Sequence, residues 1–298
     1  MASRKADLAK FPAIALLSLI AACCQAEGLM TPAELGDFTL DADSLQQWKL
    51  PKILKEISGL ALTPDDRLFA INDEQAIIYE LDYEHGMIKK TFALGRPIPS
   101  DDFEGIAYVD GLFYLVTSTG LIYVATEGND GDRVEFEIYQ TGLGRFCEIE
   151  GLAQDAQSAT LLMACKKSKK KAQSGRFSIF AWSVSGHRVL HEREITIPEH
   201  EIAERIGKKH VRPSAIVIDP RTSYIYGVAG PQQAIFQLTP DGELIDAIIL
   251  PLVDRHRQPE GIEITRDGRL LIADEGGKKK ARLGVYSPGQ NKTSDQQE

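Results

Sequence analysis

The chain has 298 residues, of which 43% are hydrophobic and 26% are charged, so it can bury a sizeable core. Its formal net charge of −9 argues against a nucleic-acid binder, because phosphate contacts need clustered Lys and Arg. The sequence has no G-x-S-x-G elbow, no H-E-x-x-H zinc motif and no P-loop, which leaves the common motif-based enzyme classes without support.

Residues 1–22 have the composition of an export signal. Three basic residues open the segment, and the apolar run that follows is too short to span a bilayer comfortably. The run ends in "IAAC", which resembles a bacterial lipobox, in which Cys23 is lipidated and the peptide is cut just before it. A simple signal peptide that is cut after Ala26 is the alternative interpretation.

The lipobox predicts a lipoprotein that is anchored in a membrane and faces the periplasm of a Gram-negative bacterium. Because Cys24 is not Asp, the resemblance to the sorting pattern leaves the outer membrane open beside the inner one. The membrane, reached through the lipid anchor, is therefore one expected partner. An unidentified envelope protein or small molecule is the other, and the protein is expected to be a monomer that binds no nucleic acid.

A unit of 46 residues repeats through the body of the chain. Each copy is recognised by a glycine, or once an alanine, that follows Glu or Ser and precedes an apolar run: Gly59, Gly105, Gly151, Ala215 and Gly261. Three of the four intervals are equal, and the longer one holds residues 197–210, which have the pattern of a short helix that begins near a proline. Such a period is typical of repeat architectures.

Each copy except the last contains four short runs rich in β-branched and aromatic residues, separated by Gly, Pro and Asp. This pattern predicts an all-β fold, a five-bladed β-propeller of four-stranded blades. The last copy has only three runs, so we expect an N-terminal strand within residues 37–50 to complete it and to close the ring. A four-bladed arrangement and a six-bladed ring with one degenerate blade are the alternatives.

The expected domain organisation follows from these patterns. A lipoprotein signal peptide occupies residues 1–22 and a tether residues 23–36, the propeller spans residues 37–288, and a disordered polar tail occupies residues 289–298.

Acidic residues recur where the innermost strand of a blade begins. Glu104, Glu150 and Glu260 precede the repeated glycines, and Ser58 and Ser214 take this place in the other two copies. The second strand runs antiparallel to the first, so its end lies at the same rim, where Asp73 and Asp274 are found. The sequence therefore predicts a ring of acids around one mouth of the central channel. The candidate metal ligands are Glu104, Glu150, Glu260, Ser214, Asp73 and Asp274.

Such a ring needs compensation for its charge. Two carboxylates about 5 Å apart repel by roughly 3 kcal/mol at an effective dielectric near 20. The acids must take up protons, pair with bases such as Lys166 and Lys167, or hold a cation. An oxygen-only ligand set suits Ca²⁺, and the lack of His at these positions disfavours Zn²⁺. The alternative is that the acids only bond backbone N–H groups and lock the ring.

Two cysteines lie in the body of the chain. Cys147 begins the innermost strand of the third copy, and Cys165 ends the second strand of the same copy. Antiparallel pairing brings these strand ends together, so the two residues either form a disulfide or remain two buried thiols.

The segments "EISGLALTPDDRLFAINDE", "DFEGIAYVDGLFYLV", "EIEGLA" and "PEGIEITRDGRLLIADE" resemble the SdiA-regulated domain family of bacterial envelope proteins. The resemblance covers residues 50–287. The family is distantly similar to NHL-repeat proteins. It implies a five-bladed propeller with a calcium site and no established biochemical activity. Glu104, Glu150 and Glu260 match the acidic positions before the family's glycines. This chain departs from the family at "CKKSKKK", where an acid is often found.

The predicted function is therefore that of a lipid-anchored, calcium-binding interaction or scaffold module of the cell envelope. The alternative is a metal-dependent hydrolase, similar to lactonases or to phytase- or esterase-like enzymes, that acts at the channel mouth. In that case the three glutamates would hold the metal and Asp73 would act as the base.

Overall fold

The computed structural model describes residues 33–169, 174–252 and 254–288. The predicted signal peptide, the lipidation site Cys23 and the predicted tail lie outside the described residues. Among the described residues, no helix combines the length and the apolar character that a membrane crossing requires.

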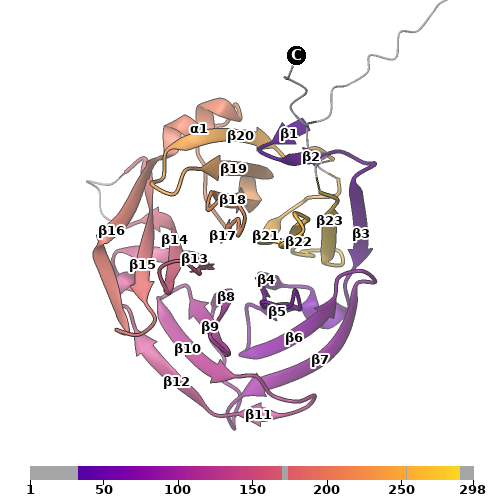
Figure 1. Ribbon diagram of the computed structural model, residues 1–298, viewed down its shortest axis with the longest axis vertical. Coiled ribbons are helices and arrows are strands. Elements are labelled where there is room, and N and C mark those ends of the chain that lie inside the picture. The colour runs from indigo at the N-terminus through magenta and orange to yellow at the C-terminus, as the bar shows by residue number, and fades with distance from the viewer. Residues whose placement is uncertain (1–32, 170–173, 253, 289–298) are drawn as a thin grey trace, which may run out of the picture. The chain divides into compact units, whose positions relative to one another are not determined.

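Five antiparallel sheets follow one another along the chain, and each provides four strands in the order innermost to outermost (Figure 1). The first blade is β4 (Ile57–Leu62), β5 (Leu68–Asn72), β6 (Ile77–Asp82) and β7 (Met87–Leu94), and the second is β8 (Phe103–Val109), β9 (Leu112–Thr117), β10 (Leu121–Thr126) and β12 (Phe136–Gln140). The third is β13 (Cys147–Asp155), β14 (Thr160–Ser168), β15 (Arg176–Ser183) and β16 (Arg188–Pro198). The fourth is β17 (Ala215–Ile218), β18 (Ile225–Ala229), β19 (Ala234–Leu238) and β20 (Leu244–Ile249), and the fifth is β21 (Pro259–Ile264), β22 (Leu270–Asp274), β23 (Arg282–Tyr286) and β3 (Leu45–Lys49).

The fifth blade joins the two ends of the described chain. Its outermost strand, β3, pairs antiparallel with β23, and Trp48 lies opposite Leu283. The prediction that a strand within residues 37–50 completes the last blade is confirmed. This pairing fastens the ring with backbone hydrogen bonds and covers an edge that would otherwise be open.

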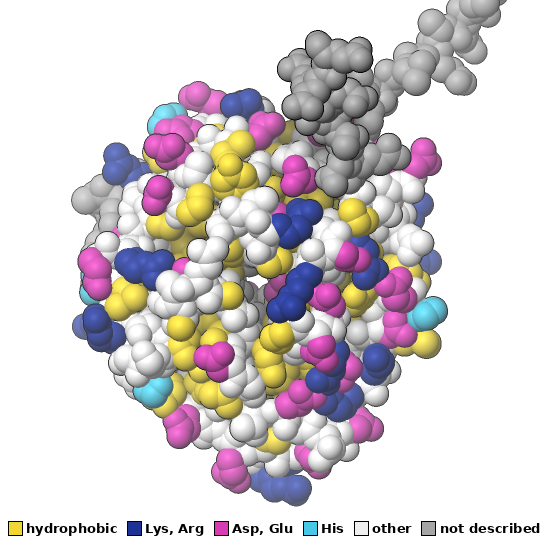
Figure 2. Space-filling view, viewed as in Figure 1, with side chains coloured by type: hydrophobic (Ala, Val, Ile, Leu, Met, Phe, Trp, Pro, Cys, Tyr) yellow, Lys and Arg dark blue, Asp and Glu magenta, His cyan; other side chains and the backbone are white. Residues whose placement is uncertain are grey.

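The innermost strands contact one another in the closed cycle β4, β8, β13, β17, β21 and back to β4 (Figure 1). The predicted all-β, five-bladed propeller is confirmed, and the four- and six-bladed alternatives are excluded. On the face drawn in Figure 2, acidic and basic side chains are interspersed, and hydrophobic side chains reach the surface near the centre.

Several shorter elements lie outside the four-stranded pattern. They are β1 (Ala33–Leu35) and β2 (Phe38–Leu40), which pair with each other, β11 (Arg133–Val134), which pairs with β7 in parallel, the 3-10 turns η1 (Lys52–Leu54), η2 (Leu143–Arg145) and η4 (Gly230–Gln232), and the helix α1 (Glu199–Arg205). α1 is the helix predicted within residues 197–210. β1 lies in the segment that the sequence predicts to be a tether. Its residue Leu35 is buried against the fourth and fifth blades.

Hydrophobic side chains fill the spaces between neighbouring blades. Successive residues of a strand face opposite sides of the sheet, so Phe113 packs toward the first blade and Tyr114 toward the third. Five apolar clusters result, and each combines side chains from two adjacent blades. This packing fixes the blades around the axis and thereby positions the strand ends that form the two mouths of the channel.

Candidate functional site

The repeated glycines lie where neighbouring blades touch at the axis. A Cβ atom added to Gly105 would lie 2.7 Å from the backbone nitrogen of Leu152 in the next blade. A Cβ atom added to Gly59 would lie 3.1 Å from Cα of Gly105. Real Cβ atoms essentially never come as close as the first distance, and the second is tighter than most real contacts, so the close approach of the innermost strands explains the glycine repeat.

A β-bulge lies beside these contact points. The strand pairing shifts so that Ser58 is an extra residue in the first blade, and Glu104 and Glu260 are extra residues in the second and fifth. In the third blade a shift falls across Glu150. A bulge takes a residue out of the regular ladder and redirects its side chain. The residues before the glycines are therefore set apart from the alternation of their strands.

Lys166 of β14 compensates part of the acidic charge. Its Nζ atom lies 2.7 Å from Oε1 of Glu150, whose side chain is only 3% exposed, and 3.8 Å from Oε1 of Glu148. Within the described residues, neither Glu104 nor Glu260 has an ion-pair partner. One ammonium group thus faces several carboxyl groups, and its closest contact is with only one of them.

The three glutamates influence one another electrostatically. Burial, together with the charge of Glu150, raises the pKa of Glu260 to about 8. Burial also raises the pKa of Glu104, followed by the charges of Glu150, Asp102 and Glu260. The pKa of Glu150 is raised by burial, although the bond from Lys166 opposes the rise. The structure therefore brings the three predicted carboxyl groups together, in surroundings that favour a proton or a cation beside them.

A small cavity lies at the axis beside this cluster. Its volume is about 10 Å³, which is the space of about one water molecule, and its lining includes Ser58, Glu104 and the glycines of three blades. Ser58 is 6% exposed, and its Oγ atom has no hydrogen-bond partner. A buried hydroxyl group without a partner is costly, so this oxygen is available to a ligand at the axis. Ser58 was not among the predicted ligands, although its place before Gly59 was the signal that could have identified it.

Ser214, a predicted ligand, has its hydroxyl group engaged elsewhere. Its Oγ atom donates to the carbonyl oxygen of Pro259 at 2.6 Å and accepts the N–H of Gly230 at 3.0 Å. It therefore links the fourth blade to the fifth, and both its hydrogen and one lone pair of its oxygen are engaged in this link. Ala215 stands in the place of the glycine in this blade, and the ladder with β18 begins there without a bulge.

Asp274, also a predicted ligand, faces away from the acid cluster. Its Oδ2 atom lies 2.8 Å from Nδ1 of His256, and Nε2 of the same ring lies 2.7 Å from the hydroxyl oxygen of Tyr286. A carboxylate only accepts, so Nδ1 donates to Asp274, while the hydroxyl group of Tyr286 holds the other ring nitrogen. Asp274 is 2% exposed and His256 is 0% exposed, so this chain of hydrogen bonds is part of the core.

The burial of His256 was missed in the sequence, because nothing in the local pattern distinguishes this histidine from those in loops. Its partners lie on β22 and β23, and only the tertiary fold brings them together.

Asp73 belongs to a second group of acids at the same mouth. Burial, together with the charges of Glu56, Glu74 and Glu275, raises its pKa to about 6. Its Oδ1 atom is buried without a hydrogen-bond partner. Glu275 also raises the pKa of Glu260, so the two groups of acids are electrostatically connected across the junction of the first and fifth blades.

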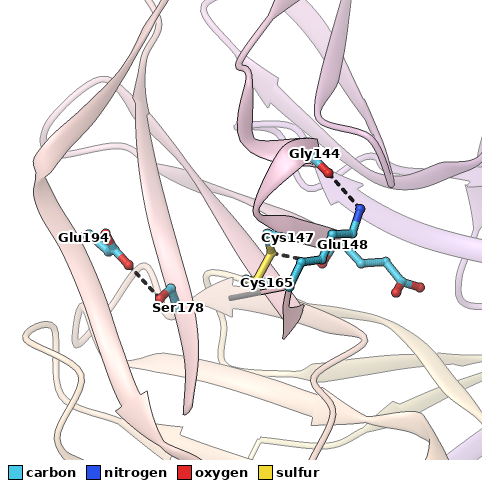
Figure 3. The surroundings of a disulfide bond; sticks show 7 residues. Gly144, Cys147, Glu148, Cys165, Ser178 and Glu194 are labelled. Carbon is cyan, nitrogen blue, oxygen red and sulfur yellow. Dashed lines mark hydrogen bonds between the residues drawn. A yellow bond between two sulfur atoms is a disulfide. The ribbon is translucent and has the colours of Figure 1, made fainter. Parts of the chain in front are cut away.

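Cys147 and Cys165 form a disulfide at this mouth (Figure 3). The bond connects Cys147, the first residue of β13, to Cys165 in the second half of β14, which continues to Ser168, and it lies close to the register shift at Glu150. Lys166 follows Cys165 directly, so the disulfide also restrains the strand that carries the cluster's ammonium group. Within the described ranges, no group of three or more His, Cys, Asp and Glu side chains is arranged so that these side chains alone could hold a metal ion.

The closed ring of four-stranded blades defines the chain as a β-propeller. A family model described as SdiA-regulated matches residues 188–293, which run from the outer strand of the third blade through the fifth. The predicted resemblance to this family is thus confirmed, over that part of the chain. No match was found among curated proteins.

Two solved structures share the architecture at low sequence identity. A glutaminyl cyclase from Myxococcus xanthus has a TM-score of 0.53 and 12% identity, with 81% of this chain and 96% of that chain covered. A glucose dehydrogenase has a TM-score of 0.53 and 15% identity, with 81% and 99% covered. At these identities the likeness shows the fold alone.

Proposed function

We propose that the protein is a binding module that holds Ca²⁺ against the side chains of Glu104, Glu150, Glu260 and Ser58. The channel mouth where these residues lie is called the acidic mouth. One observation carries the proposal: an ion-sized cavity at the axis is lined by a carboxyl group without an ion-pair partner and by a buried hydroxyl oxygen without a partner. Carboxylate, hydroxyl and carbonyl oxygens are the ligands that Ca²⁺ prefers. The resemblance to the SdiA-regulated family favours the same ion.

The ion would supply the positive charge that Lys166 does not provide to Glu104 and Glu260. Without it, burial favours protons on these two carboxyl groups. With it, both groups ionise and four of the five blades share one charged centre at the axis. The ion would then make the module rigid for an envelope partner or a small molecule that docks at the same mouth.

Calorimetric titration of residues 25–298 with Ca²⁺ tests the proposal. We expect one bound ion per chain, and a loss of affinity of at least about tenfold in Glu104→Gln and in Glu260→Gln, since each variant removes a charged ligand. Glu135→Gln is the matched control, because Glu135 is exposed between β11 and β12. Equal and negligible binding by the wild type and both ring variants would show that Lys166 and protons alone compensate the acids.

We also propose that Cys23 anchors the protein in a bacterial membrane, on the strength of the lipobox pattern. Two or more acyl chains on one cysteine would hold the protein stably, whereas one chain gives only reversible binding. Mass spectrometry of the protein from a membrane fraction should find a lipid-modified N-terminal Cys23, and Cys23→Ser should release the protein into the soluble fraction. Cleavage after Ala26 would contradict the anchor.

A metal-dependent hydrolase is the second candidate, and Asp73 is the observation that favours it. A carboxyl group with a pKa raised to about 6 can accept a proton near neutral pH, as a general base must. Hydrolysis of a lactone or a phosphoester that disappears with a chelator and in Asp73→Asn would support this function. The lack of turnover across both substrate classes would leave the binding module as the account of the site.

A further inference from the structure

The opposite mouth of the channel contains a larger cavity. Its volume is about 280 Å³, and every blade contributes to it: Leu62, Tyr108, Gln154, Ile218 and Ile264 line it from the first to the fifth blade. These residues lie at or next to the ends of the innermost strands, whereas the acid cluster lies at their beginnings. A pocket on the axis, apolar for the most part and built from all five blades, is a typical place for a small ligand.

The carboxyl group of Glu263 in this cavity has no charged partner among the described residues. Glu263 of β21 lines the cavity, and its carboxyl group accepts hydrogen bonds only from backbone N–H groups, those of Ile264 and Leu62. Among the described residues it takes part in no ion pair, and burial alone raises its pKa, to about 8. A carboxyl group without a cation in such a place is uncommon, because the charged form is costly there.

Two other acids of the lining are paired. Asp155 lies 3.2 Å from the guanidinium of Arg193, and Asp219 lies 2.7 Å from that of Arg221. Asp66, in the turn after β4, also lines the cavity without an ion pair in the described part of the chain, and the basic residue of the lining, Arg266, is exposed. Glu263 is therefore the acid on an innermost strand of this lining that has no counterion among the described residues.

The cavity continues outward between the third and fourth blades. A groove of about 620 Å³ shares the lining residues Asp155, Gln157, Ile218 and Ser223 with it and extends to Arg193 and Asp241. A ligand seated at the axis thus has room for a substituent that points toward solvent.

We propose that this cavity binds a small organic cation, an amine with an apolar body, whose ammonium group pairs with Glu263 at the axis. The apolar lining takes the body of the ligand, and the carboxylate supplies the charge-assisted hydrogen bond that fixes its orientation. The same carboxylate excludes an organic anion of equal shape, because two like charges would meet in a poorly solvated place.

Three probes of one shape test the charge selection: 2-phenylethylamine, its uncharged isostere 2-phenylethanol, and the anion phenylacetate. Titrations followed by calorimetry and by protein NMR should show the amine binding at least about tenfold more tightly than the alcohol, and no binding of the anion. Glu263→Gln should remove the preference for the amine, while Glu135→Gln should retain it. Equal binding of the three probes, or no binding of the amine at millimolar concentration, would overturn the proposal.

A second variant locates the ligand without changing a buried residue. Ala156 is exposed in the turn after β13 and lines the cavity, so Ala156→Trp should block the entrance in a folded protein. We expect it to abolish binding of the amine and to leave Ca²⁺ binding at the acidic mouth unchanged. Amine binding that persists in Ala156→Trp, or that is lost in Glu104→Gln instead, would place the amine elsewhere and contradict the proposal.

Discussion

The two mouths of the channel are made by the two ends of the same five strands, yet they differ in chemistry. At the beginnings of the strands, strand irregularities carry three glutamates, of which Glu104 lines a cavity of about 10 Å³ and Glu150 pairs with Lys166. At the ends, a cavity of about 280 Å³ has a lining that is apolar for the most part and contains Glu263, a carboxyl group on an innermost strand without an ion pair among the described residues. The repeat explains the difference, because the glycine that opens each copy permits close contact at one end of the strand only.

The comparison teaches that a repeated motif and a single substitution produce different kinds of site. The acidic mouth depends on equivalent positions in several blades, so removing one member weakens a shared centre. The apolar mouth depends on Glu263, which has no equivalent acid at this end of the neighbouring blades: Ala61, Ala107 and Ala153 follow the glycines by two residues, and Val217 follows Ala215 by two. Substitutions that affect binding at one mouth and not at the other can therefore be designed.

The largest expected effect comes from the contact between neighbouring innermost strands at the axis. Gly105→Ala places a methyl group 2.7 Å from the backbone of Leu152, and overpacking of this kind costs up to about 3 kcal/mol of stability. Urea denaturation should show the loss, and binding at both mouths should weaken together. Gly111→Ala is the control: it has a φ of +87° and no atom within 4 Å, so it should cost only about 1 kcal/mol. Equal losses in the two variants would contradict close packing at the axis.

Removal of the disulfide should affect the acidic mouth alone. The double variant Cys147→Ser, Cys165→Ser opens a loop with a sequence separation of 18, which corresponds to about 3 kcal/mol in the chain-entropy model. Thermal unfolding should detect the loss, and Ca²⁺ affinity should fall because the strands that carry Glu150 and Lys166 are less restrained. Binding of 2-phenylethylamine at the opposite mouth should be retained in the folded variant, and its selective loss would contradict the separation of the two mouths.

Asp274→Asn should lower the stability of the protein without changing Ca²⁺ binding at the acidic mouth. The substitution disturbs the buried bond to His256 and should lower the free energy of unfolding by about 2 kcal/mol. Because Asp274 faces the histidine, Ca²⁺ binding by the folded variant should equal that of the wild type. A large drop in Ca²⁺ affinity without a loss of stability would return Asp274 to the acid ring.

The pH dependence of stability gives the smallest effect. A carboxyl group whose pKa is higher in the folded state binds more protons when folded, so stability falls as the pH rises. For Glu260 the loss spans the range from 4.5, the ordinary pKa, to about 8. Denaturation at several pH values without Ca²⁺ should show a decrease of on the order of 1–2 kcal/mol that Glu260→Gln reduces. A stability that rises across this range in the wild type, and equally in the variant, would contradict the raised pKa.

The fold was largely predictable from the sequence, because the 46-residue repeat and the apolar runs carry the propeller pattern directly. The closing strand was predictable too, since the last copy lacked one run and only the N-terminal segment could supply it. β1 was not predicted, because three residues carry too weak a pattern.

The site was predictable only in part. Glu104, Glu150 and Glu260 were found because their places repeat, and Ser58 shares that place but was passed over as a ligand. The side chain of Ser214 points toward its bond partner in the fifth blade, and that of Asp274 points toward His256. No local sequence pattern predicts these hydrogen bonds. The cavity around Glu263 combines strand ends from five copies, so only the assembled ring shows it.

The most direct test of the central claim, that the acidic mouth holds Ca²⁺ on buried carboxyl groups, is the number of protons released when the ion binds. Calorimetric titration at pH 7 in buffers of different ionisation enthalpy measures this number. Since burial raises the pKa of Glu104 and Glu260 well above the ordinary range, we predict the release of between one and two protons per Ca²⁺, and fewer in Glu260→Gln. Binding without proton release in the wild type would place the ion on exposed carboxylates and contradict the account.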